Sequence, residues 1–541
     1  MRKNASGTFH CPDRLFVNGD LYTLDPAAPR AGVLAVSQGK IRYAGFSIKE
    51  GAARLAANAE HIDLGGKAVF PGFIDSHLHF LTLGQQLTEM DIYLKSREDI
   101  LQAVAREVAA TEPGKWIIGR GWNNEIWPDK TWPHKDELDA IAPNNPVILT
   151  RTDAHSIWVN SAALALTGYT PESPDPPGGE IRRSANGELT GILVDTAIFQ
   201  IWAVLPPLTE SEKLKAWQKA QQELLAHGIT SIGDAWLYPE DFALLQQFYA
   251  EGRLGIRCSA MLGGADKAGN SIFSPETRPV RGLYDARLSL DMFKVVLDGS
   301  LGSRSAWLLE DYADCPGHKG SGRYEDDELL HILLPPARQG FRLCLHAIGD
   351  AAVEQALRAY AELARLCPQQ TTRHRIEHFQ IASKDQIRRC LDLGVIPAMQ
   401  SIHEAADKRM AEARLQKTTL AKAYPWRGVI DAGGIIANGS DSPMENMNPA
   451  PGLHAAVART PFAGFSDKAE TLRLSRQEAL LSYTHWAAMA QGEEAIKGRL
   501  AEGMLADFFV TDRDIAACPE QELAQAKTLL TVLGGEIVFE S

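Results

Sequence analysis

Short hydrophobic runs alternate with amphipathic segments through the middle of the chain. The runs have the length and composition of buried strands, and the segments between them have the period of helices. This alternation predicts a parallel sheet with crossover helices. The predicted strands are residues 67–79, 229–232, 256–262, 293–297, 342–346, 374–378, 395–399 and 435–438. Eight such units close a (β/α)8 barrel, so we expect an α/β fold of the TIM-barrel type.

The amphipathic segments predict where the crossover helices lie. Residues 212–227, 351–366 and 384–393 each place apolar side chains on one helical face. A shorter helix over 326–334 is expected to stop or kink at Pro335-Pro336. Proline has no backbone N–H, and its ring clashes with the preceding helical turn.

Both ends of the chain consist of short alternating segments separated by turn residues. Asn18-Gly19 and Gln38-Gly39 are typical of hairpin turns. The β segments predicted in this way are residues 15–17, 21–24, 33–36, 41–45, 506–510 and 529–539. We therefore expect residues 1–66 and 491–541 to pair into one small β-sandwich, with residues 67–490 forming the barrel.

The interval from about 95 to 225 is too long for one barrel crossover. We interpret it as an insertion, which contains a tryptophan-rich piece at 119–127 and a proline-rich loop at 171–179. Long structured insertions at a barrel mouth often form a lid or a substrate wall.

Charge and cysteine content narrow the class of function. The formal net charge is −13, and lysine and arginine are scattered, which disfavours nucleic-acid and anionic-membrane partners. The seven cysteines are widely spaced without a Cys-x-x-Cys pair, as in a reduced cytoplasmic protein. No apolar stretch is long enough for a signal peptide or a membrane span. We expect a cytoplasmic protein that acts on a small molecule.

Residues able to bind or organise a metal lie at the ends of the predicted strands. Two histidines at i and i+2 of a strand project from the same face and form a chelating pair suited to zinc. The residues at strand ends are His77, His79, Lys294, His346, His378 and Asp441. Taken singly, each has a structural reading, such as a buried hydrogen-bonded histidine or a helix N-cap. Because the carboxyl ends of barrel strands meet at one face, the six together predict a metal site.

The order of these six residues resembles that of the amidohydrolase superfamily. The sequence around them resembles the branch of the superfamily that includes N-substituted formamide deformylase. The sequence motifs on which the resemblance rests are residues 71–77, 298–304, 346–350, 375–378, 439–443 and 503–507. The resemblance covers nearly the whole chain and is specific for superfamily and branch, not for substrate.

The resemblance implies a binuclear metal centre, usually with zinc. One ion would be held by His77, His79 and Asp441, and the other by His346 and His378. Lys294 would be carboxylated by CO2 to a carbamate that bridges both ions. A hydroxide between the ions would attack a substrate carbonyl, with Asp441 as the general base. The implied reaction is hydrolysis of a carbon–nitrogen bond other than a peptide bond, in an amide, formamide or cyclic amide.

Further side chains are candidates for substrate contacts. Asp153-Ala154-His155 resembles a branch motif with glycine at its middle position, which makes His155 a candidate. The others are Trp122, as part of an apolar wall with Trp127, Arg304, as a clamp for a carboxylate, and Gln400 and His403, which follow the seventh strand. Each also has a structural alternative, namely packing, loop hydrogen bonding, or an ion pair of Arg304 with Asp311 or Asp314.

Three alternatives stay open from the sequence. Related enzymes with the same six ligands open lactones or phosphotriesters. Some barrels of this superfamily have lost their ligands and persist as scaffolds, whereas none of the six is missing here. A mononuclear deaminase would normally lack the bridging lysine. Assemblies are common among relatives, so a homo-oligomer is possible, but no coiled-coil pattern proves one.

Overall fold

The computed structural model describes residues 12–152, 155–176, 179–264, 272–368, 372–465 and 472–541. Contacts divide the chain into two compact units. One contains the described residues up to Gly84 together with Leu214–Ser541, and the other is Gln85–Lys213. Within the described ranges, no helix is both long and apolar enough to cross a membrane.

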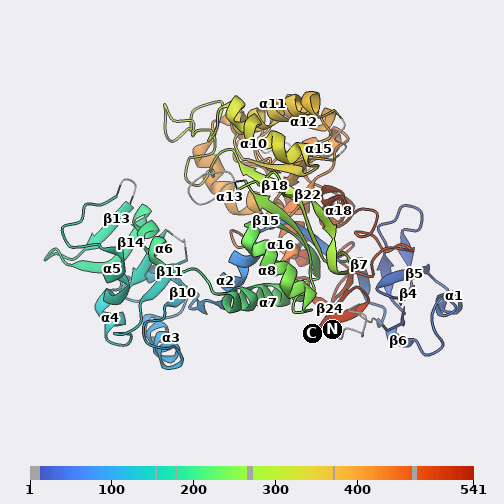
Figure 1. Ribbon diagram of the computed structural model, residues 1–541, viewed down its shortest axis with the longest axis horizontal. Helices are drawn as coiled ribbons and strands as arrows, with labels where there is room; N and C mark the ends of the chain where they lie inside the picture. Colours follow the sequence, from blue (N-terminus) through green and yellow to red (C-terminus); the bar gives the residue numbers. More distant parts are fainter. Residues whose placement is uncertain (1–11, 153–154, 177–178, 265–271, 369–371, 466–471) are drawn as a thin grey trace. The chain divides into compact units, whose positions relative to one another are not determined.

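Eight parallel strands form a nearly closed barrel in the larger unit (Figure 1). Neighbouring strands pair in the order in which they follow along the chain. They are β8 (Phe73–Leu78), β15 (Ile229–Leu237), β16 (Arg257–Gly263), β18 (Leu288–Val296), β19 (Arg342–Ala347), β20 (Arg375–His378), β21 (Ile396–Met399) and β22 (Ala437–Asn438). A short strand, β17 (Val280–Gly282), adds antiparallel to β18. The predicted TIM-type α/β barrel is confirmed.

Backbone hydrogen bonds join the end of β8 to the loop after β22. The Asp441 N–H donates to the His77 carbonyl at 2.7 Å, and the His79 N–H donates to the Ser442 carbonyl at 2.8 Å. The loop approaches β8 so closely that a Cβ at Gly439 would lie 2.7 Å from the His77 nitrogen. Glycine at this position therefore permits the contact between the first and last strands.

The helices that follow the barrel strands match the sequence pattern closely. Those predicted are α7 (Glu210–Ala226), α11 (Asp350–Leu366) and α12 (Lys384–Asp392). Helix α10 (Asp326–Arg338) contains Pro335 and Pro336 and does not stop there, contrary to one form of the expectation. Both prolines lie in its last turn, where their carbonyls still accept from the Gln339 N–H at 3.2 and 3.1 Å. The helix lacks only the two hydrogen bonds that backbone N–H groups at these positions would donate.

Strands from both chain ends share a six-stranded sheet, in the order β25-β24-β23-β7-β2-β3. These strands are β2 (Asp20–Tyr22), β3 (Arg30–Ala31), β7 (Ala68–Pro71), β23 (Phe508–Thr511), β24 (Thr528–Leu533) and β25 (Glu536–Glu540). A four-stranded sheet contains β1 (Arg14–Val17), β4 (Val33–Ser37), β5 (Lys40–Gly45) and β6 (Glu60–Asp63). One core with Phe16, Val69 and Phe508 includes side chains from both sheets. The sandwich is thus built from both ends, while its exact limits at 66 and 491 stay predictions.

Two details of the strand prediction are wrong. The single strand expected at 67–79 is divided at Gly72, because β7 belongs to the terminal sheet and β8 to the barrel. A Cβ at Gly72 would lie 2.1 Å from Thr230 Oγ1, so the crossing point has room only for glycine. Asn18-Gly19 does not close a hairpin, because β1 and β2 lie in different sheets, whereas Gln38-Gly39 does connect the antiparallel pair β4 and β5.

The second unit is a mixed sheet with its own core. Its strands are ordered β13-β14-β12-β11-β10-β9 and are β9 (Met90–Asp91), β10 (Ile117–Trp122), β11 (Val147–Arg151), β12 (Ser156–Val159), β13 (Gly179–Arg183) and β14 (Leu189–Asp195). Trp122, Trp127 and Trp158 pack in one cluster with residues of α3 (Arg97–Ala110). The unit occupies much of the interval interpreted as an insertion, and its role as a lid stays a prediction.

A buried ion pair joins the first residue of β16 to the terminal sheet. Arg257 contacts both carboxylate oxygens of Asp507, at 2.5 and 2.9 Å, and both side chains are at most 5% exposed. The same carboxylate accepts the Gly534 N–H at 2.7 Å. Burial alone would raise the pKa of Asp507, but Arg257 holds it below its ordinary value.

We predict that Asp507→Asn lowers the free energy of unfolding by about 3–5 kcal/mol, because it leaves Arg257 buried without a counter-charge. Denaturant unfolding followed by circular dichroism measures the change. The control is Glu362→Gln, which removes an exposed partner of Arg365 and should cost at most about 1 kcal/mol. Equal small effects of the two variants would contradict the prediction.

Candidate metal centre

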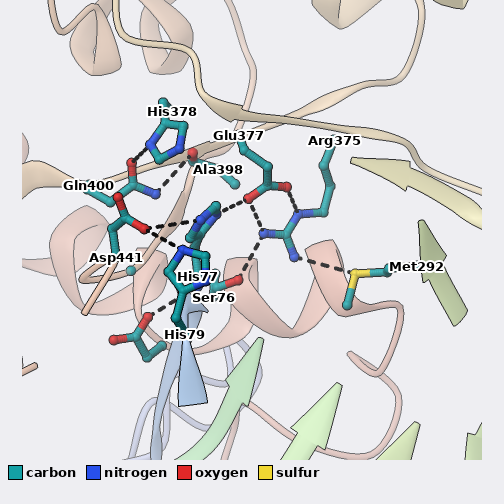
Figure 2. A network of polar contacts seen from close by, with 12 residues as sticks. Ser76, His77, His79, Met292, Arg375, Glu377, His378, Ala398, Gln400 and Asp441 are labelled. Atoms are coloured by element: carbon teal, nitrogen blue, oxygen red, sulfur yellow. Dashed lines mark hydrogen bonds and ion pairs between the residues drawn. The ribbon is translucent and has the colours of Figure 1, made fainter. Parts of the chain in front are cut away.

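Two histidines and one aspartate converge where the first and last barrel strands meet. His77 is at the end of β8, and its Nε2 lies 3.3 Å from Asp441 Oδ1. His79 follows the strand, and its Nε2 lies 3.4 Å from the same oxygen. Figure 2 shows both imidazoles pointing toward the Asp441 carboxylate. The three form a group that is able to hold a metal ion.

The spacing of these atoms is that of ligands around one ion. An N–H···O hydrogen bond spans about 2.7–3.2 Å, which is shorter than either distance. Two ligand atoms that each lie about 2.0–2.1 Å from a tetrahedral zinc ion are about 3.3–3.4 Å apart. The observed 3.3 and 3.4 Å therefore fit a shared ion, and the donor set of two imidazoles and a carboxylate suits zinc.

A second group shares Asp441. His378, His403 and Asp441 place their ligand atoms within 4.8 Å of one another. His378 ends β20, and its ring centroid lies 4.8 Å from that of His77. Both His378 and Asp441 have left-handed backbone conformations, with φ of 71° and 58°. Non-glycine residues rarely adopt this region, and such strain clusters at functional sites.

A buried acid fixes the orientation of His77. The His77 Nδ1–H donates to Glu377 Oε2 at 2.5 Å, so that Nε2 is left to face Asp441. Arg375 binds the same carboxylate with two hydrogen bonds of 2.8 Å and donates to the Ser76 carbonyl at 2.9 Å. Burial alone would raise the pKa of Glu377, but Arg375 and His77 hold it well below its ordinary value. The chain Arg375–Glu377–His77 runs through the middle of Figure 2.

Arg375 and Glu377 appear in the sequence analysis only as part of the motif at 375–378 that ends with His378. The available signal was a pair of opposite charges at i and i+2 in a predicted buried strand. Glutamate and arginine are rarely fully buried unless they are paired, so two such residues in a buried strand indicate buried partners. Their partner His77 is distant in sequence, which is why the link was missed.

Gln400, predicted as a substrate contact, bonds to a candidate ligand, and its contact with a substrate stays a prediction. The His378 Nδ1–H donates to Gln400 Oε1 at 2.8 Å, which leaves His378 Nε2 for another partner. Burial lowers the pKa of His378 well below its ordinary value, with a further contribution from His346, so the ring is neutral. A neutral imidazole is the form that binds metals.

Lys294 and His346 lie close to these groups. Lys294 is 2% exposed on β18, and burial lowers the pKa of its amine. The His346 ring lies 4.5 Å from that of His378, but its Nε2 lies 3.4 Å from Asp298 Oδ1 and 3.5 Å from the Gly299 carbonyl. His346 is not in the two groups of His and Asp ligand atoms found among the described residues. Their roles as ligands stay predictions.

Two buried carboxylates hold the loops around the centre. Asp298 accepts N–H groups from Trp307, Ile348 and Gly349 at 2.9–3.1 Å, which links the loops after β18 and β19. Asp75 accepts the Ser440 N–H at 3.1 Å, and burial raises its pKa to about 7. These bonds satisfy loop N–H groups that would otherwise be buried without acceptors.

The remaining predicted contacts each have a partner within their own unit. Trp122 is fully buried in the second unit and donates to the Leu149 carbonyl at 2.7 Å, which agrees with its structural alternative, and its role as a substrate wall stays a prediction. His155 is 71% exposed in that unit and pairs with Asp195 at 2.6 Å, while Asp153 and Ala154 lie outside the described residues. Arg304 pairs with Asp314 at 2.7 Å, which was one of its structural alternatives.

A model of the amidohydrolase family matches residues 60–539, which is most of the chain. The chain belongs to the amidohydrolase family. This agrees with the barrel, with the histidine pair at the end of its first strand, and with the resemblance noted from the sequence. The family assignment makes the protein a metal-dependent hydrolase in class.

Named relatives and a solved structure align over nearly the full length of this amidohydrolase. Putative amidohydrolase YtcJ of Bacillus subtilis is 31% identical over 96% of this chain and 98% of its own. N-substituted formamide deformylase of Arthrobacter pascens is 28% identical over 98% of both chains. A crystal structure of an uncharacterized metal-dependent hydrolase from Pyrococcus furiosus is 28% identical, with a TM-score of 0.77 over 93% of this chain and 100% of that one.

We predict that Glu377→Gln weakens zinc binding about 10–100-fold, because the acid that orients His77 and raises its basicity is lost. Competition with a chelator of known affinity measures the change. Asp507→Asn is the matched control, because it removes a carboxylate from another buried arginine, away from this centre. A Glu377→Gln protein with the affinity of the wild type would show that the contact is structural only.

Proposed function

We propose that this amidohydrolase cleaves a carbon–nitrogen bond other than a peptide bond, in an amide, a formamide or a cyclic amide. The observation that carries the proposal is the placement of His77 and His79 on one oxygen of Asp441, at 3.3 and 3.4 Å. The Arthrobacter relative, an N-substituted formamide deformylase, makes formamides the first substrates to test.

We infer a centre for two divalent ions, with zinc as the first metal to test. His77, His79 and Asp441 would hold one ion. His378 would hold the other, with His346 as its partner in the resemblance and the carbamate of Lys294 between the two. Ions bound in this way acidify a water molecule and polarise a substrate carbonyl.

Burial prepares Lys294 for the proposed modification. Reaction of a lysine with CO2 requires the neutral amine, and burial lowers the pKa of Lys294 in that direction. The residue is 2% exposed on β18 and lies near enough to Asp441 and His378 to interact with them electrostatically. These facts support the carbamate, together with the resemblance.

Asp441 is the general base of the proposed reaction. Burial alone would raise the pKa of Asp441, but His77 and His79 hold it well below its ordinary value. A carboxylate of low pKa accepts a proton only from a strongly acidified donor, and water at a divalent ion is such a donor. Asp441 would take that proton and pass it to the leaving nitrogen.

We predict that Asp441→Asn retains bound metal and loses about 10²–10⁴-fold in turnover, because the amide still offers an oxygen ligand but accepts no proton. Elemental analysis and steady-state kinetics measure the two properties. The control is Asp407→Asn, which alters a nearby carboxylate that accepts from Tyr424 and Gln380. Full turnover by the Asp441→Asn enzyme would refute the assigned role.

A substrate panel with metal removal tests the reaction class. The panel contains N-substituted formamides, N-acyl amino acids, hydantoins, lactones and organophosphates. We predict turnover of members with a carbon–nitrogen bond, loss of activity after dialysis against a chelator, and recovery with Zn²⁺. Preference for lactones or organophosphates would favour the alternative hydrolases. Protein purified without chelator that holds almost no metal would favour a scaffold.

Two further expectations accompany the proposal. A cytoplasmic location stays a prediction, which is based on the cysteine content. A possible homo-oligomer also stays a prediction, because assemblies are common among relatives.

A further inference from the structure

Trp236 lies near the carboxyl end of β15, the second strand of the barrel. The pairing of β15 with β16 shifts register between Asp234 and Leu237, so β15 has a bulge where Trp236 lies. A bulge turns nearby side chains out of the regular alternation of a strand, and bulges are frequent beside active sites. The direction of the Trp236 side chain therefore has to be found from its contacts.

The indole of Trp236 covers Gly263, the last residue of β16. A Cβ at Gly263 would lie 2.5 Å from Trp236 Cε2 and 2.6 Å from its Nε1, so glycine leaves the room that the ring occupies. Gly263 comes two residues after Met261, so both residues face the same side of the sheet. Met261 packs with side chains of β15, β18 and β19 in one buried cluster, which lies inside the barrel. The indole therefore covers the inner side of Gly263.

Lys294 is the neighbour of Gly263 on the next strand. The two residues pair in register between β16 and β18, and paired strands are about 4.7–4.9 Å apart. Lys294 comes two residues after Met292, which belongs to the same inner cluster. Its amine interacts electrostatically with Glu377 and Asp441. The indole of Trp236 thus borders the candidate metal centre on the side of Lys294.

Tyr238 adds a second ring beside Trp236. The two ring centroids are 6.5 Å apart, with 75° between the ring planes, which is an edge-to-face arrangement. Tyr238 directly precedes α8 (Pro239–Ala250) at the same end of β15. Both side chains are partly exposed, whereas Trp217 is fully buried and packs against Phe248. Trp236 and Tyr238 together form an aromatic wall with surface left for a further contact.

We propose that this aromatic wall binds an aromatic group carried on the nitrogen of the substrate. The inference rests on the proposed function and names a substrate class within it. Apart from its nitrogen, the carbonyl carbon of a formamide carries only hydrogen, so any larger group must be bound to the nitrogen. An aromatic ring gains about 2–12-fold in affinity from a stacked or edge-to-face contact, beyond the gain from burial of its area.

The test compares N-phenylformamide with N-cyclohexylformamide, which is similar in size, on the full-length enzyme loaded with Zn²⁺. The ratio of their kcat/KM values should fall about 2–12-fold in Trp236→Leu, because the aromatic contact is lost while an apolar side chain remains. Trp236→Phe should keep most of the ratio. Turnover of N-methylformamide, which has no ring, should stay unchanged in both variants. Because ratios are compared between variants, the different reactivities of the leaving amines cancel.

The outcomes separate this inference from the proposed function. An equal loss for all three formamides, or an unchanged ratio in Trp236→Leu, would overturn the inference. A preference that changes only between benzamide and cyclohexanecarboxamide would put the aromatic group on the carbonyl side and would also overturn it. A wild type that hydrolyses no amide or formamide would overturn the proposed function itself, and this result is visible before any variant is made.

A second variant displaces the indole without removing it. Gly263→Ala introduces a Cβ 2.5 Å from the ring, so the ring must leave its position, and the ratio should fall as in Trp236→Leu. The control is Gly32→Ala in the terminal sandwich, where a Cβ would lie 3.4 Å from the nearest atom of Phe46. Elemental analysis checks that each variant keeps its metal. A wild-type ratio in Gly263→Ala would overturn the inference.

Discussion

The candidate centre depends on the contact between the end of β8 and the loop after β22. Backbone bonds from Asp441 to His77 and from His79 to Ser442 bring together residues more than 350 positions apart. Gly439 makes the approach possible, and the Asp75 carboxylate holds the loop from below. Any local disturbance of this contact moves Asp441 relative to both histidines, so barrel closure and site geometry are one constraint.

Charge balance is the second constraint on this rim. Several imidazoles, a lysine, an arginine and four carboxylates are buried together, which is costly unless the charges are paired or the groups are neutral. The structure uses both means. Glu377 is ionised between Arg375 and His77, while burial keeps His378 and Lys294 toward their neutral forms. Neutral nitrogen and ionised oxygen are the states in which these side chains bind divalent cations.

The histidines near Asp441 accept support from different kinds of hydrogen-bond acceptor. His77 is backed by a carboxylate and His378 by an amide oxygen. A carboxylate raises the basicity of an imidazole more than an amide does, so the two ligand groups are not equivalent.

The sequence by itself determined the order of elements, the barrel, and the residues at strand ends, because hydrophobic period and strand-end chemistry are local properties. It also led to the Gln38-Gly39 hairpin. Only the tertiary structure decided the hydrogen-bond partners: Glu377 for His77 and Gln400 for His378. The same holds for Asn18-Gly19 and for the division of 67–79 at Gly72. Such choices depend on which surfaces meet after the barrel closes, and no local pattern in the chain carries that information.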